Sequence, residues 1–117
     1  MKMIVRKAIL KSIEHHKRMQ KWVKKEKPVF DGINEFKWQM KDAISESFWA
    51  DDCPLCQLFD FDIGCYYCPL AQKYGECGYR RNAWSSLITA TTWKEWLKAD
   101  EKLVRQLRSL LKIKEKK

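Results

Sequence analysis

The chain has 117 residues, of which 45% are hydrophobic and 33% charged, and its formal net charge is +9. This length fits one domain with a modest core, because a small domain leaves much of its surface in water. No stretch of the sequence approaches the roughly 20 apolar residues that span a bilayer. Charges at Arg6, Lys7 and Lys11 interrupt the first apolar residues, which argues against a secretory signal peptide. We therefore expect a cytoplasmic protein.

The positive charge is concentrated at the two ends of the chain. Residues 1–27 contain ten Lys or Arg and two acidic residues, and residues 98–117 contain eight and three. Residues 28–97 between them contain six basic and ten acidic residues. Basic ends favour polyanions such as nucleic acid, an anionic membrane surface or an acidic protein, although the same charge can serve solubility alone.

The first predicted element is a long amphipathic helix at residues 4–25. Its apolar residues recur at three- and four-residue spacing, its lysines gather on the opposite side, and Pro28 ends the pattern. His15 lies at the edge of the apolar side and His16 in its middle. We expect core or capping histidines. The alternative is that one of them binds a metal, or donates a hydrogen bond to a cysteine sulfur.

Further helices are predicted at 32–49, at about 80–89 and at 92–113. The first of these follows Asp31, a suitable N-cap residue, and Trp38 falls off its apolar stripe. The last begins with Thr-Trp-Lys-Glu, which matches the capping box. In that motif the Thr and Glu side chains each bond an exposed backbone N–H of the helix end.

Five cysteines lie in the segment 53–78. Four of them form two Cys-x-x-Cys pairs with eight residues between the pairs, so that each tight turn presents two thiolates. A structural zinc ion is the leading interpretation. An iron–sulfur cluster, a redox dithiol and five simply buried cysteines are the alternatives. The predicted ligands are four of the five cysteines Cys53, Cys56, Cys65, Cys68 and Cys77. Cys77 is either the one that does not bind or a replacement for Cys65 or Cys68.

Together these elements predict a mainly α protein. We expect residues 1–117 to form a small single domain of three to four helices around a Cys-rich zinc-binding loop module. A short hairpin inside that module is compatible with its sequence. No period-2 pattern of useful length indicates a strand elsewhere.

Several of these motifs resemble a group of small uncharacterised proteins of bacteriophages and prophages. Those proteins carry a helical motif like S-I-x-H-W-x-R-M, then C-x-L-C, a short loop, C-x-x-C-P and a final Cys. The resemblance covers about residues 12–84 and implies a viral or prophage origin, a host-cell location and no particular reaction. It places His15 at the motif histidine and all five cysteines at the group's cysteines, whereas His16 stands where the group usually has Trp. The matching segments are SIEHHKRM (12–19), CPLC (53–56), CYYCPL (65–70), Cys77, Tyr79 and Trp84.

No catalytic constellation is visible, since the sequence lacks a Gly-rich phosphate loop, a His-Glu-x-x-His pattern and a nucleophile elbow. We therefore expect a binding protein rather than an enzyme. The leading hypothesis is salt-sensitive, largely sequence-independent binding of nucleic acid through basic helices. The alternative is a factor that binds and modulates a host protein of transcription or defence, with tryptophans as anchors. The predicted contact residues are Lys7, Lys11, Arg18, Lys21, Lys25, Arg80, Arg81, Arg105, Arg108 and Lys112.

Overall fold

The computed structural model describes residues 3–28, 30, 32–48, 54, 69–74 and 83–111. The regular elements in these ranges are helices, which confirms the mainly α prediction. They are α1 (Met3–Glu26), α2 (Ile33–Ile44), α4 (Pro69–Tyr74), α5 (Ala83–Ile88) and α6 (Trp93–Leu111). None of these helices has the length and apolar character needed to cross a membrane.

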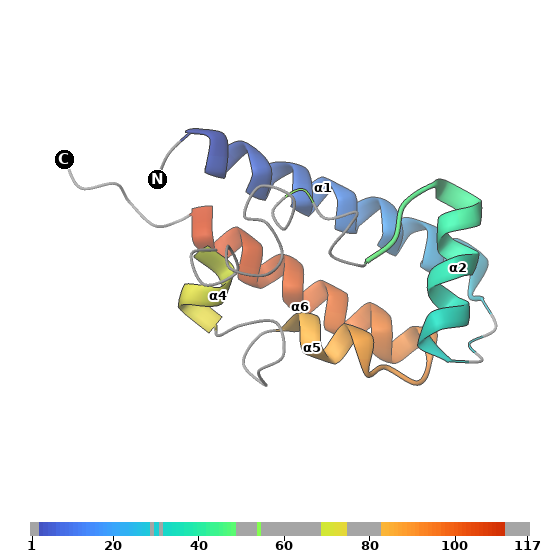
Figure 1. Ribbon diagram of the computed structural model, residues 1–117. Helices are drawn as coiled ribbons and strands as arrows, with labels where there is room; N and C mark the ends of the chain where they lie inside the picture. The colour runs from blue at the N-terminus through green and yellow to red at the C-terminus, as the bar shows by residue number, and fades with distance from the viewer. Residues whose placement is uncertain are drawn as a thin grey trace.

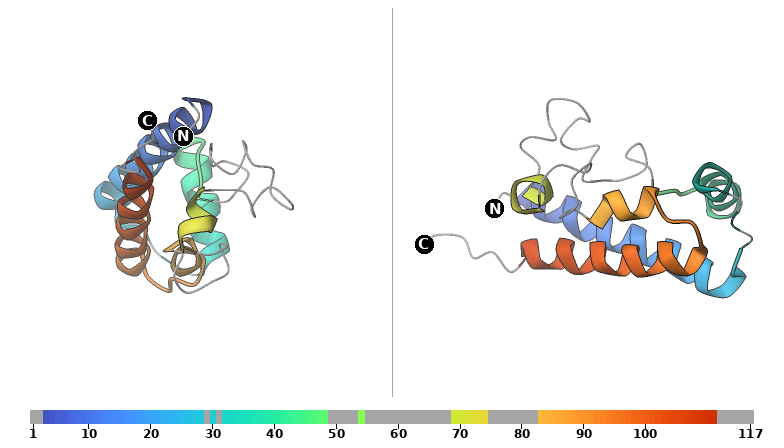
Figure 2. Two further views of the ribbon diagram at one scale, coloured as in Figure 1. Left: turned by 90° about the vertical axis from the view of Figure 1, so that its left-hand side faces the viewer. Right: turned by 90° about the horizontal axis from the view of Figure 1, so that it is seen from below.

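The two long helices α1 and α6 lie side by side and form the frame of the molecule (Figures 1 and 2). Each helix turns a continuous stripe of mainly apolar side chains inward, because residues three and four positions apart share a helix face. The stripe of α1 includes Ile9, Met19 and Val23, and that of α6 includes Trp96 and Leu107, all buried. The predicted helix at 4–25 is thus confirmed within a residue at either end.

The end of α1 and the start of α6 both have identifiable caps. After α1, Lys27 takes a left-handed conformation (φ 45°) and its N–H donates to the Val23 carbonyl at 2.8 Å, a common helix termination. Before α6, the Thr92 hydroxyl accepts from the Glu95 N–H at 3.0 Å, as the capping box predicts. The Glu95 carboxylate, however, accepts from the N–H of Thr91 at 3.0 Å. The reciprocal bond is therefore shifted by one residue.

The second predicted helix is shorter than the sequence suggests. We expected it to continue to residue 49, but α2 ends at Ile44, where Ser45 adopts a left-handed conformation (φ 60°) and its N–H donates to the Lys41 carbonyl at 2.8 Å. Ser47 and Phe48 are buried, as the extended stripe predicted, yet they lie beyond the helix end. The helix start has Gly32 as its N-cap, and Asp31 lies outside the described residues.

An aromatic cluster fixes α2 against the end of the α1–α6 pair. The ring of Phe36 lies 4.6 Å from that of Phe30, 5.4 Å from Trp96 and 5.9 Å from Phe48, measured between centroids. Trp22 of α1 adds a contact at 6.2 Å. Such ring pairs add stabilisation beyond their buried area. The cluster therefore joins α1, α2, α6 and the segment that follows α2.

The short helices pack on α6. The predicted helix at about 80–89 is observed as Ala83–Ile88, and its first N–H donates to the Gln106 side-chain oxygen at 3.0 Å. Helix α4 was not predicted, and its Tyr74 hydroxyl meets the Ser109 hydroxyl of α6 at 2.7 Å. The predicted module at 53–78 lies, apart from Pro54 and α4, outside the described residues. The same holds for its five cysteines and for the hairpin considered there.

Candidate functional site

The exposed side of α1 carries a groove lined with lysines. It has a volume of about 470 Å³ and is lined by Lys17, Lys21, Lys24 and Lys25, together with half-buried Gln20. Spacings of three, four and seven residues bring these side chains to one side of the helix. Four neighbouring ammonium groups make the groove a region of positive potential, and such regions attract anions.

This positive region continues onto α6. Lys24 lies 3.7 Å from Glu101 of α6, which marks where the exposed sides of the two helices meet. Exposed Lys98, Arg105 and Arg108 stand three, four and seven positions from Glu101 and therefore share its side of α6. We call the combined feature the basic surface. It consists of Lys17, Lys21, Lys24, Lys25, Lys98, Arg105 and Arg108.

The structure brings some of the predicted contact residues together and separates others. Lys21 and Lys25 line the groove, and Arg105 and Arg108 are exposed on the side of α6 that carries Glu101. Lys7 and Lys11 are exposed nearer the start of α1, outside the groove lining. Arg80, Arg81 and Lys112 lie outside the described residues.

Two residues that line the groove, Lys17 and Lys24, are not among the contact residues predicted from the sequence. The prediction chose lysines directly opposite the apolar stripe, whereas these two lie toward α6. Their spacing of four and three residues from Lys21, which places them on the same side of α1, was a usable indication.

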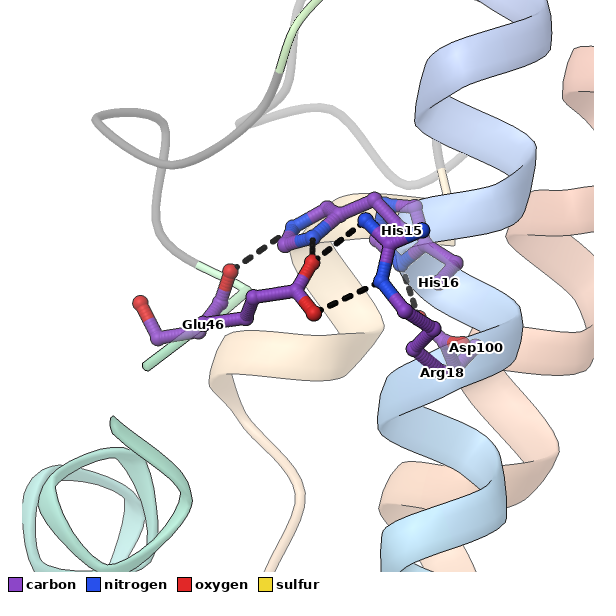
Figure 3. A network of polar contacts seen from close by, with 6 residues as sticks. His15, His16, Arg18, Glu46 and Asp100 are labelled. Atoms are coloured by element: carbon purple, nitrogen blue, oxygen red, sulfur yellow. Dashed lines mark hydrogen bonds and ion pairs between the residues drawn. The ribbon is translucent and has the colours of Figure 1, made fainter. Parts of the chain in front are cut away.

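Arg18 differs from the other predicted cations because it is held in an ion pair. Its Nε and Nη2 atoms donate to the two carboxylate oxygens of Glu46, each at 2.7 Å, in a bidentate arrangement (Figure 3). The hydrogen bonds from Arg18 lower the pKa of Glu46; those from His15 add to this effect, and burial opposes it. Glu46 is therefore a stable carboxylate, and Arg18 is not a free cation.

His15 is buried between two oxygen atoms on the segment after α2. Its Nδ1 lies 2.7 Å from the Glu46 carboxylate, and its Nε2 lies 2.9 Å from the Ser47 carbonyl oxygen (Figure 3). The side chain is 1% exposed. The expectation of a core histidine is confirmed. Both ring nitrogens face oxygen atoms, and the cysteines of the alternative interpretation lie outside the described residues.

His16 points to the other carboxyl group of the interior, Asp100 of α6. Its Nδ1 lies 2.5 Å from Asp100 Oδ1, and the Gln20 amide donates to Asp100 Oδ2 at 2.7 Å. His16 is 2% exposed and Asp100 is fully buried. Gln20 thus reaches from the interior network to the lysine groove. Within the described ranges, no group of three or more His, Cys, Asp or Glu is arranged to hold a metal ion.

No protein-family model, curated protein or solved structure matches this chain. Its functional interpretation therefore depends on its own residues.

Replacing Asp100 should destabilise the protein strongly. We expect Asp100→Ala to lower the free energy of unfolding by about 3–5 kcal/mol, because a buried imidazole and a half-buried amide lose their common partner. The neighbouring Glu101→Ala is the matched control. It removes only a half-exposed ion pair and should cost less than about 1 kcal/mol. Urea unfolding of both variants measures the difference, and equal losses would contradict the role given to Asp100.

Proposed function

We propose that this protein binds nucleic acid through the basic surface of α1 and α6, contacting mainly the phosphate backbone. The observation that carries the proposal is the groove in which four lysines of α1 lie together, next to the exposed cations of α6. Backbone phosphates are regularly spaced anions, and neutralising them releases bound counterions, which drives association at low salt.

The character of the surface favours binding that depends little on base sequence. Its side chains are lysines and arginines. A lysine attracts a phosphate as a point charge, and an arginine can donate two parallel hydrogen bonds to it. The exposed large apolar side chains of the described residues are Met3, Ile4, Leu10 and Trp38. The one aromatic residue among them lies on α2, away from the groove lining. Base stacking, which strengthens single-strand binding, is therefore not part of this proposal.

We expect the double variant Lys21→Ala/Lys25→Ala to weaken duplex DNA binding and to flatten its salt dependence. Each neutralised phosphate contributes about 0.9 to the slope of log K against log salt. Loss of two contacts should therefore reduce the slope by about 1.8. Fluorescence anisotropy at several salt concentrations measures the slope directly.

Lys7→Ala/Lys11→Ala is the control for this experiment, because it removes the same charge from the same helix outside the groove. Its slope should stay close to that of the unaltered protein. An equal reduction in both variants would indicate diffuse attraction to the whole helix. An unchanged slope in the groove variant would remove the groove from consideration.

We also propose that four of the five cysteines hold a structural zinc ion. The support is the sequence spacing of two Cys-x-x-Cys pairs, since four thiolates complete a closed tetrahedral zinc site. A metal would supply stability that a small core provides only in part. Zinc serves folding in this proposal and no reaction.

Elemental analysis with an absorption spectrum tests the zinc proposal. Anaerobically purified protein should contain stoichiometric zinc and be colourless, and Cys53→Ser or Cys56→Ser should lose the metal and melt at a lower temperature. Iron with sulfide and a broad band near roughly 400 nm would instead identify a thiolate-ligated cluster. A Cys53→Ser variant with unchanged metal content and melting temperature would also contradict the proposal.

A second candidate function, binding of a partner protein, is favoured by Trp38. This side chain is 56% exposed on α2, with the Lys37 ammonium 4.5 Å from its ring centroid. Exposed tryptophans are frequent anchors of protein interfaces. The resemblance to phage proteins would make that partner a host protein.

Trp38→Ala separates the two candidate functions. If α2 binds a protein, a complex recovered from nuclease-treated host lysate should be lost in Trp38→Ala and retained in Lys21→Ala/Lys25→Ala. The fold should not change, because surface substitutions usually alter stability by less than about 0.5 kcal/mol. A complex that survives Trp38→Ala would rule out this anchor.

A further inference from the structure

We infer that His15 is a proton-operated latch, which fastens residues 45–48 to α1 while its imidazole carries two protons. These residues follow the left-handed end of α2 and precede Cys53 in the sequence. The inference concerns the interior of the protein and is independent of nucleic-acid binding on the basic surface.

The hydrogen-bond acceptors around the His15 ring fix the number of N–H groups that the ring must carry. The Ser47 carbonyl oxygen can only accept a hydrogen bond, and so can the ionised Glu46 carboxylate. The distances from the ring nitrogens to these oxygens, 2.9 and 2.7 Å, both require an N–H on the histidine. A neutral imidazole has one N–H and an imidazolium has two. Only the charged form satisfies both contacts.

The carboxylate beside His15 supports this protonation state. From the segment after α2, Glu46 Oε1 contacts the ring directly, and from α1 the Arg18 guanidinium binds both Glu46 oxygens, so that this carboxylate faces two cations. His16 of α1 packs edge-on at 5.2 Å, and the Asp100 carboxyl of α6 contacts His16 in turn. A buried cation is costly unless it is paired and hydrogen-bonded. Here the cation lies against a carboxylate and a carbonyl oxygen.

The latch holds one side of a segment that is also held by the core. Phe48 is 1% exposed and packs against Phe36 and Trp96, and those contacts do not depend on protonation. Loss of one proton from His15 would leave a nitrogen lone pair facing an oxygen atom. The resulting opening should therefore be confined to residues 45–47, while Phe48 keeps its place in the core.

The direction of the pH effect follows from these contacts. The folded contacts require an N–H on both ring nitrogens, so the latch loses strength at alkaline pH, where an imidazolium loses one of them. On the acid side, the lowered pKa of Glu46 means that its contribution is present above the ordinary glutamate value and is lost as pH falls through the folded value. The latch is thus strongest between these two limits.

Nitrogen NMR of the histidine rings tests the protonation state directly in the full chain. At about pH 6.5, the ordinary histidine value, both ring nitrogens of His15 should carry protons, and His15→Gln assigns the resonances. The doubly protonated signal should disappear at higher pH together with hydrogen-exchange protection at Ser47. A neutral tautomer with a single N–H at about pH 6.5 would overturn the inference.

Unfolding measurements across pH test the consequence. The unfolding equilibrium constant should rise roughly tenfold as His15 loses its proton, the factor expected for one hydrogen bond to a charged group, and His15→Gln should lack this rise. Superimposable profiles would overturn the latch. If His15→Gln does not fold, Glu46→Gln provides the second test. It should lose the acid rise and weaken the alkaline one, because the imidazolium loses its paired carboxylate, and an unchanged acid limb would also contradict the latch.

Discussion

The buried carboxyl group of Asp100 is the contact on which the rest of the arrangement depends. It holds His16 at 2.5 Å and the Gln20 amide at 2.7 Å, so that one side chain of α6 bonds two successive turns of α1. Apolar stripes alone would allow the two helices to slide or rotate, since dispersion contacts have little direction. A buried carboxyl needs particular partners and therefore fixes the register of the pair. The position of Gln20, and with it the lysine groove, follows from that register.

The adjacent histidines show how one helix turn can serve two neighbouring elements. His15 and His16 are separated by 100° around α1, so one faces the segment after α2 and the other faces α6. Each meets an acidic side chain, yet the two sites differ in solvent contact. Glu46 is 22% exposed and shared with Arg18, whereas Asp100 is fully buried. The partly exposed site is the one that can open without unpacking the helix pair.

Sequence periodicity predicted the features that depend on residues within one helix, namely the position of the helix and its apolar side. The apolar stripes of α1 and α6 span several turns, and both limits of α1 and the start of α6 were predicted within a residue. The end of α2 was missed because Phe36, Met40, Ile44 and Phe48 keep a four-residue spacing past the helix end. Tertiary packing of Phe48 decides that boundary. The bond from His15 to Glu46 crosses 31 residues, and no local pattern indicates such a pairing. The exposed lysines were visible, but the groove they form was not.

The side of α1 that stabilises the fold is distinct from the side that we propose binds nucleic acid. Its inward side carries the stripe and both histidines, and its outward side carries the groove lysines, which contribute little to the core. Because side chains on opposite faces of a helix share few partners, changes on them should add independently. Adjacent positive charges on one face cost some self-repulsion, which screening by salt reduces. Four adjacent lysines on this face therefore cost a little stability, and under the proposed function an anionic ligand in the groove would offset that cost.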